Sequence, residues 1–296
     1  MTEKRSSLLA SAELLVAAGL WGFGFIAAIW ALQGLSAVQI TFWRFFLAAL
    51  LLLYFLTREA GRVAMRENLR LSFWPAVLLL STLLLQTWGL MYTTATKSGF
   101  ITTLYVVFVP LFEAVWRRER LPFSICLCVG TALFGTGLIV NFGIGDFNYG
   151  DLLTLICAVF AALQICVVGA VSVKVRKPFV FNLVQSGWAT LLCLPLFLYH
   201  PVPVAPPAVW TPQIWTGILT LAFGSTVIAF YLQVRAQAHL SATVSSILFL
   251  LESPFAMVFA MLLLNESLDR YEAVGATLIF LSALAASLLE ARRKKF

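Results

Sequence analysis

The distribution of basic residues limits what this chain can fold into more strictly than any other feature. Short polar loops separate ten apolar segments, each long enough for one helix to cross a bilayer. If the N-terminus is cytoplasmic, all but three of the 20 Lys and Arg residues lie on the cytoplasmic side, the exceptions being Arg44, Lys97 and Arg270. Positive charge is retained on that side during membrane insertion, so the asymmetry predicts both the number and the orientation of the helices.

The ten segments are 9–32, 38–57, 72–91, 98–116, 123–141, 150–172, 178–199, 213–233, 241–264 and 271–290. They predict an all-α polytopic membrane protein with ten transmembrane helices and with both the N- and the C-terminus cytoplasmic. A soluble helical protein would show a polar face every 3.6 residues, and apolar runs such as residues 47–56 show none. A transmembrane β-barrel would alternate apolar and polar positions, which these runs do not.

Two stretches in opposite halves of the chain resemble each other. Residues 103–112 and 246–255 are both apolar, and each carries a proline near the middle of a long helix, Pro110 or Pro254. Each is followed by a short acidic turn, which contains Glu119 in the first half and Glu266 in the second. We therefore interpret the chain as two copies of one unit.

The predicted units are residues 1–146 and residues 147–296, with five helices each. Because five is odd, the second copy must insert upside down relative to the first. The charge pattern agrees, since it places the Glu119 turn inside and the Glu266 turn outside. Inverted repeats of this kind are typical of secondary transporters, which bind substrate near the middle of the membrane.

Several short motifs follow one another in a characteristic order. They are Leu20-Trp21-Gly22, Trp43-Arg44-Phe45, the stretch 97–110, Leu251-Glu252 with Glu266 fourteen residues later, and Gly275. In this order and spacing they resemble the ten-helix EamA-type members of the drug/metabolite transporter (DMT) superfamily, across essentially the whole chain. The resemblance implies transport of amino acids or related amphipathic compounds, because aromatic amino acid exporters share this architecture.

The chain departs from the family pattern at two points. The family usually places a proline directly after the glutamate, whereas here Ser253 separates Glu252 from Pro254. The acidic turn also follows Pro110 sooner than the corresponding turn follows Pro254, so about one helical turn is missing at the cytoplasmic end of the fourth segment. We expect a local change in the gate rather than another fold.

Glu252 lies near the middle of the segment 241–264, where an ionised carboxylate costs about 2.5–3.5 kcal/mol even on the lowest scales. One interpretation is functional: Glu252 binds a substrate amine or carries a proton. The other is that it is a protonated or hydrogen-bonded packing residue beside the proline break. The sequence leaves both open.

Aromatic and amide side chains give the remaining binding candidates. By the resemblance, helices one, three, four and eight of the fold surround a central cavity, and helix six adds Gln164. The predicted substrate-binding residues in or beside them, together with the acid, are Trp21, Gln86, Trp88, Tyr92, Tyr105, Gln164, Tyr231, Gln233 and Glu252. Such a cavity suits a small amphipathic solute. The alternative for each Trp and Tyr, and for Tyr92 above all, is an anchor at the membrane interface.

Hinge or gating roles are predicted for Gly22, Pro110 and Pro254, because glycine and proline allow or force helix bending. Simple kinks or close helix packing would use the same residues. Arg44 can snorkel to headgroups, form an ion pair or attract a carboxylate, and the peripheral place of helix two in the family favours a structural or topological role. For Glu113 the simplest partner is Arg117, four residues on.

These features predict a secondary transporter that exports a small amphipathic metabolite by alternating access across a bacterial-type inner membrane. An organic-cation transporter is the alternative, while a non-transporting scaffold and an intramembrane enzyme are remote ones. We expect no enzyme, since His200 and His239 lie near helix ends and no catalytic constellation occurs. We expect no metal, no cofactor and no nucleic acid, with proton coupling left open; the partners are a small-molecule substrate and the lipid bilayer, and the protein is a monomer or a homodimer.

Overall fold

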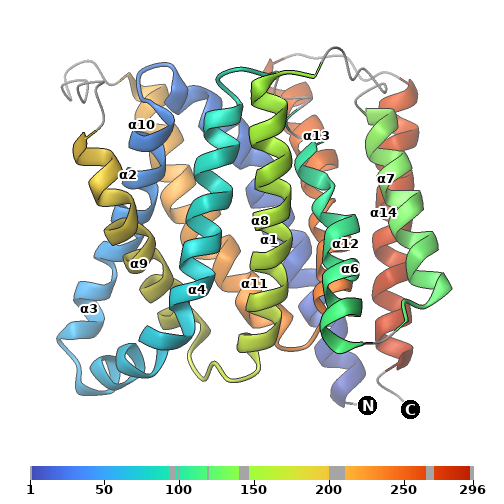
Figure 1. The fold of residues 1–296 in the computed structure, drawn as a ribbon, viewed down its shortest axis with the longest axis horizontal. Helices are drawn as coiled ribbons and strands as arrows, with labels where there is room; N and C mark the ends of the chain where they lie inside the picture. Colours follow the sequence, from blue (N-terminus) through green and yellow to red (C-terminus); the bar gives the residue numbers. More distant parts are fainter. Residues whose placement is uncertain are drawn as a thin grey trace.

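The computed structural model describes residues 2–93, 98, 101–118, 120–139, 147–199, 211–264 and 270–293. All regular secondary structure in these ranges is helical. The helices are α1 (Thr2–Leu32), α2 (Ala37–Leu50), α3 (Leu52–Leu56), α4 (Glu59–Gly89), α6 (Tyr105–Arg117), α7 (Phe123–Ile139), α8 (Tyr149–Ser172), α9 (Pro178–Tyr199), α10 (Pro212–Leu219), the π-helix η2 (Thr220–Ala229), α11 (Phe230–Gln237), α12 (Ala242–Phe249), α13 (Glu252–Leu264) and α14 (Arg270–Arg293). They stand side by side, and α1 begins at the end of the bundle where α14 finishes (Figure 1).

Eight helices or runs of consecutive helices are long and apolar enough to cross a membrane, and two shorter apolar helices, Ile101–Trp116 and Phe123–Leu138, accompany them. Each of these elements overlaps one of the ten apolar segments of the sequence. The protein is therefore an all-helical, polytopic membrane protein.

Helix α4 begins well before its predicted start at residue 72. Residues 59–71 consist mainly of Ala, Arg, Glu, Met and Leu, which favour helix, so the chain stays helical through what the charge pattern suggested was a loop. Arg62, Arg66 and Arg70 are spaced by four residues and are exposed along one face of this extension. The basic residues here lie on a helix that continues beyond the apolar segment.

The segment 241–264 is divided into α12 and α13 by a break at Leu250 and Leu251. Pro254 has no N–H to donate to the Leu250 carbonyl, which accepts instead from the Ser253 N–H at 3.1 Å. Pro110, in contrast, lies inside α6, and the nearby turn falls upstream of that helix, at Leu104. The two prolines therefore have different effects on their helices.

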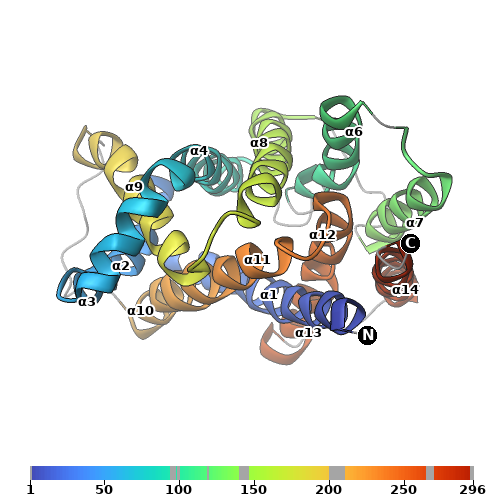
Figure 2. The same ribbon diagram turned by 90° about the horizontal axis from the view of Figure 1, so that it is seen from below.

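Most helix packing joins the two halves of the chain. Helix α1 packs on α10, η2, α11 and α13; α4 packs on α8 and α9; α2 packs on α9; and α7 packs on α14. Figure 2 shows α2 beside α9 and α7 beside α14. The two halves share one core and meet around the middle of the bundle.

Glycines allow some of these contacts to be very close. A Cβ atom on Gly135 of α7 would stand 2.7 Å from the Gly275 carbonyl oxygen of α14. A Cβ atom on Gly89 of α4 would stand 2.7 Å from the Thr154 hydroxyl of α8. Close backbone approach of this kind is a common way to pack helices in lipid.

Candidate functional site

A pocket lies between the two halves and is bounded by α1, α2, α4, the start of α6, α8, η2, α11 and the residues on either side of the α12–α13 break. Its walls come from Trp21–Ala28 in the second half of α1, from Ile40 and Arg44 in the first half of α2, and from Leu79–Leu90 at the end of α4. In Figure 1 these parts of α1, α2 and α4 lie between the middle of the bundle and the end opposite the start of α1. The pocket therefore occupies one half of the bundle's depth.

Six of the nine predicted binding residues line this pocket: Trp21, Gln86, Tyr105, Gln164, Gln233 and Glu252. The other three lie outside it. The side chain of Trp88 is 41% exposed and that of Tyr92 is 53% exposed, with its ring 5.6 Å from that of Tyr149. Tyr231 packs its ring 5.6 Å from that of Phe179 and accepts a hydrogen bond from Nη1 of Arg235 at 3.2 Å.

Helical periodicity explains this division. A residue two positions further along a helix points to nearly the opposite side. Gln86 faces the pocket, so Trp88 faces away from it, whereas Leu90, four positions from Gln86, lines it again. In the same way Phe230 and Gln233 line the pocket, and Tyr231, two positions from Gln233, does not.

Glu252 is the first residue of α13, directly after the break. Its side chain is half-buried and faces the pocket, and the Tyr105 hydroxyl donates to Oε1 at 3.4 Å. The N-terminal end of a helix carries a partial positive charge, which favours a carboxylate in this place. The break thus puts the acid both at a helix N-terminus and on the wall of a cavity.

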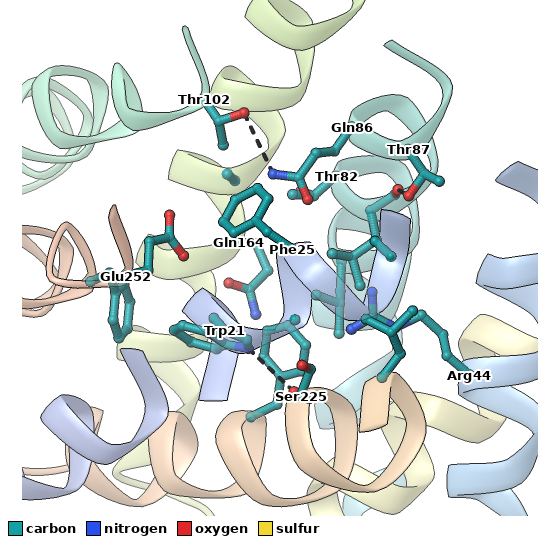
Figure 3. A pocket seen from close by; sticks show the side chains of 18 of the residues that line it. Trp21, Phe25, Arg44, Thr82, Gln86, Thr87, Thr102, Gln164, Ser225 and Glu252 are labelled. Carbon is teal, nitrogen blue, oxygen red and sulfur yellow. Dashed lines mark hydrogen bonds between the residues drawn. The ribbon is translucent and has the colours of Figure 1, made fainter. Parts of the chain in front are cut away.

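Trp21 is held in the wall by contacts with η2, α11 and α12, and Figure 3 draws its bond to Ser225. Its Nε1 donates to the Ser225 carbonyl of η2 at 3.2 Å. Its ring stands 5.1 Å from the ring of Phe230 and 5.1 Å from that of Phe249. These rings give the pocket a rigid aromatic surface suited to the apolar part of a small solute.

Three buried glutamines connect α8 and α11 at the wall of the pocket and just beyond it. Nε2 of Gln233 donates to Oε1 of Gln164 at 3.1 Å and to Oε1 of Gln237 at 3.0 Å. Gln237 in turn donates to the Ile165 carbonyl at 2.9 Å. Oε1 of Gln233 is buried without a hydrogen-bond partner among the described residues. A polar group left in this state is a candidate acceptor for a ligand donor.

Arg44 lies on the pocket wall, although helix two was expected at the periphery of the bundle. Its side chain is only 6% exposed, and Nε donates to the Thr226 hydroxyl of η2 at 3.0 Å. The reason is that α2 is not peripheral here: it packs on α4, α9 and η2. The four-residue spacing from Ile40 to Arg44 puts both residues on the same face of α2.

The π-helix η2 forms part of the pocket wall, and side chains of other helices hydrogen-bond several of its carbonyl groups. Trp21 donates to the Ser225 carbonyl, and Nδ2 of Asn182 on α9 donates to the carbonyls of Thr226 at 2.9 Å and Val227 at 3.0 Å. The Thr226 hydroxyl donates five residues back, to the Leu221 carbonyl, at 2.7 Å. Departures from α-helical geometry of this kind often occur at functional sites.

The sequence model of the EamA-like transporter family matches the chain twice, over residues 9–141 and over residues 148–288. The chain belongs to the EamA-like transporter family of the DMT superfamily. The protein is accordingly a membrane transporter by family.

Its relatives agree with this membership. An uncharacterized transporter of Archaeoglobus fulgidus is 30% identical over 285 residues, which cover 95% of this chain and 86% of the relative. The uncharacterized transporter YetK of Bacillus subtilis is 25% identical over 246 residues, which cover 78% of this chain and 72% of YetK. A solved crystal structure with 17% identity matches 99% of both chains with a TM-score of 0.76, which shows a shared fold.

In this EamA-family chain, polar contacts join helices at the end of the bundle where α1 begins. Oε2 of Glu113 on α6 accepts hydrogen bonds from the backbone N–H of Thr243 at 2.8 Å and from its hydroxyl at 2.5 Å. Nε of Arg235 on α11 forms an ion pair with Oε1 of Glu13 on α1 at 3.0 Å. The side chain of Arg117, the predicted partner of Glu113, lies outside the described residues. The observed contacts fasten the start of α12 to α6, and α11 to α1.

The predicted hinge residues have distinct surroundings. Gly22 packs against α13, where a Cβ atom would stand 2.8 Å from the Ala256 nitrogen and 2.8 Å from the Glu252 carbonyl oxygen. Pro254 adjoins the α12–α13 break, and Pro110 lies within α6. Their roles in bending stay predictions. Of the other residues that the sequence singled out, Lys97, Glu119, His200 and Glu266 lie outside the described residues.

Proposed function

We propose that this EamA-family protein is a secondary transporter that exports a small amphipathic metabolite, an amino acid or a related compound, by alternating access. The observation that carries the proposal is the pocket between the two halves, which combines an aromatic surface at Trp21, neutral amides at Gln86 and Gln164, and an acid at Glu252. Clefts with mostly apolar walls and a few converging polar groups are typical sites for small solutes.

The proposed architecture is ten transmembrane helices in two inverted repeats, residues 1–146 and residues 147–296. The two family matches support it, since each of them falls within one of these halves. The proposed orientation has both termini in the cytoplasm of a cell with a bacterial-type inner membrane. Arg62, Arg66 and Arg70 support this orientation. They are exposed in the first part of α4, and positive charge is retained on the cytoplasmic side during membrane insertion.

In this orientation the pocket would face outward. It occupies the half of the bundle away from the start of α1, while the Glu113–Thr243 and Glu13–Arg235 contacts lie toward the cytoplasmic end. Alternating access requires a second conformation in which these contacts open and the pocket closes on the other side. Two similar halves that share one core can exchange such conformations at a small difference in free energy.

Protons are the proposed coupling ion. Glu252 is an acid on the pocket wall, and intramembrane acids of this kind serve as proton carriers in many transporters. A carboxyl group that binds either a proton or a substrate amine, but not both, would couple the movement of protons to the movement of the substrate. No nucleotide is required in this mechanism.

An organic-cation transporter is the second candidate, and the aromatic surroundings of Glu252 are the observation in its favour. Trp21, Phe249 and Tyr105 line the same part of the pocket as the acid. Aromatic faces together with a carboxylate can hold a quaternary ammonium group through cation–π contacts. The two candidates differ in whether the solute also carries a carboxylate.

The outer surface of the bundle suits the lipid bilayer. Leu127 and Phe134 on α7, and Phe280 and Leu284 on α14, are exposed apolar side chains. The protein is proposed to act as a monomer or a homodimer in this bilayer.

Counterflow in proteoliposomes tests the proposed function. The protein is reconstituted with an unlabelled solute inside, and uptake of labelled amino acids and of labelled choline-like cations is followed. Accumulation of one class above protein-free liposomes supports transport and selects between the two candidates. Absence of uptake for every solute of a broad metabolite panel would contradict the proposal.

Glu252→Gln, with Glu67→Gln as control, extends the experiment. Glu67 is exposed on the extension of α4, far along that helix from the pocket residues Leu79–Leu90. Loss of uptake in the first variant alone supports Glu252 as ligand or proton carrier. Unchanged uptake in both variants would leave the transporter standing and assign Glu252 to packing.

A further inference from the structure

Two residues of the pocket wall are acidic or basic, counted over the part of the chain that the structure describes: Arg44 on α2 and Glu252 on α13. Figure 3 shows them on opposite sides of the pocket, with Trp21 and Gln164 between them. The pocket therefore offers a cationic side and an acidic side to whatever it binds. A solute with a single charge would be attracted by one side and repelled by the other.

The guanidinium of Arg44 is buried without an acidic partner among the described residues. Its one hydrogen bond there goes from Nε to the neutral Thr226 hydroxyl at 3.0 Å, and the guanidinium carbon lies 5.9 Å from the centre of the Phe45 ring. A guanidinium has five N–H donors, so four are left on the two Nη atoms. Burial of a cation is unfavourable unless an anion or several hydrogen bonds compensate for it.

The position of Arg44 agrees neither with snorkelling to the headgroups nor with an ion pair inside the bundle. A snorkelling side chain would reach the headgroup region and be exposed, whereas Arg44 is 6% exposed and turned toward η2. An ion pair inside the bundle would need a carboxylate within about 4 Å, and none of the described residues supplies one. The remaining explanation is that the anion comes with the ligand.

The surroundings of Arg44 position its planar group. Thr226 is held by its own bond to the Leu221 carbonyl at 2.7 Å, and Asn182 holds the Thr226 carbonyl at 2.9 Å. Figure 3 shows the nitrogens of Arg44 directed toward the middle of the pocket. A guanidinium fixed at Nε presents its Nη atoms as a fork that matches the two oxygens of a carboxylate.

We propose that Arg44 binds the carboxylate of the substrate while Glu252 faces its ammonium group, so that the pocket selects zwitterionic solutes over organic cations. The proposal rests on the transport function above and assigns its substrate class. Trp21 and the rings around it contact the apolar part of the same solute. Thr226 is a positioning residue, since it acts through Arg44.

Binding and counterflow with the reconstituted full chain test the proposal. The probes are labelled α- and ω-amino acids, the amines that result from removing their carboxylates, and the carboxylates that lack the amine. Arg44→Gln removes the charge, Arg44→Lys keeps the charge without the fork, and Arg62→Gln, exposed on α4, is the control. Each variant is first compared with the wild type in size-exclusion elution and thermal unfolding.

The wild type is expected to prefer the zwitterion over its amine by about tenfold or more. Arg44→Gln should abolish this preference, because the variant loses affinity for the zwitterion while its affinity for the amine stays the same or rises. Arg44→Lys should retain part of the preference, and Arg62→Gln all of it. A purely structural arginine would lower binding of zwitterion and amine together, and that result would overturn the proposal.

Thr226→Val provides a second route should Arg44→Gln fail to fold. It removes the hydroxyl that accepts from Nε of Arg44 and keeps the volume of the side chain. KM for the zwitterion should rise severalfold while KM for the amine stays the same; equal changes in both would contradict the proposal. If the wild type transports amines but not zwitterions, the proposal for Arg44 is overturned and the proposed transport function stands. If no probe is transported, both the proposal for Arg44 and the proposed transport function are overturned.

Discussion

Gly22 of α1 lies so close to Glu252 of α13 that a Cβ atom on the glycine would stand 2.8 Å from the glutamate's carbonyl oxygen. The same atom would stand 2.8 Å from the Ala256 nitrogen, so the contact is between two backbones and no flexible side chain can yield. Trp21, the neighbour of Gly22, and Glu252 both line the pocket. The position of the acid therefore depends on a glycine in another helix.

Gly22→Ala is expected to push α13 away from α1 and to lower stability by about 1–3 kcal/mol, as overpacking generally does. Thermal unfolding in detergent measures the effect, and the transport rate should fall with it because Glu252 moves. Gly130→Ala is the matched control, since a Cβ atom there meets nothing within 4 Å. Equal melting temperatures for the two variants would contradict this account of Gly22.

Glu252→Gln is expected to make transport insensitive to external pH. The amide keeps the shape of the side chain but cannot exchange a proton, so the pH dependence of the wild-type rate should disappear. Initial rates of uptake across a series of external pH values measure it. Tyr105→Phe removes the hydroxyl that donates to Oε1 at 3.4 Å but leaves the acid, and should keep the pH dependence. A pH profile of Glu252→Gln that equals the wild-type profile would rule out proton transfer at this residue.

Glu113→Ala should open the end of the bundle where α1 begins. The variant removes the acceptor of two hydrogen bonds from Thr243, which hold the start of α12 on α6. Cys166, which is buried, lines a small cavity together with Glu113 and Ser241. The expected result is therefore a several-fold faster reaction of Cys166 with a small thiol reagent, measured by peptide mapping.

Glu67→Ala controls for the loss of a carboxylate, since Glu67 is exposed on α4. Cys126 is exposed in the structure and reports whether the reagent itself reacts equally in all samples. An unchanged rate at Cys166 in Glu113→Ala would mean that the Glu113–Thr243 contact does not hold this end closed.

The ten apolar segments could be placed from the sequence because length and hydropathy act locally. Local composition also explains the main error in the boundaries: residues 59–71 are polar but favour helix, so hydropathy alone placed the start of α4 too late. The π-helix at Thr220–Ala229 could not be predicted in this way. Its carbonyl groups accept hydrogen bonds from Trp21 and Asn182, and both of these residues lie far from the π-helix in the sequence.

The residues that line the pocket could also be predicted only in part from the sequence. The residue types at Trp21, Gln86 and Glu252 identified candidates, but the rotation of each helix decides which of them face inward. Trp88 is two residues from Gln86 and faces away from the pocket. Arg44 was ambiguous in the sequence because its surroundings come from η2, which no local pattern places beside α2.

The most direct test of the central claim compares two tryptophans in one transport assay. Trp21 lines the pocket, whereas Trp88 lies outside it on the exposed side of α4. If the pocket is the substrate site, counterflow by folded Trp21→Ala should fall about tenfold or more, equivalent to about 1.4 kcal/mol, and Trp88→Ala should keep the wild-type rate. Full transport by Trp21→Ala, or an equal loss in both variants, would contradict the assignment of this pocket.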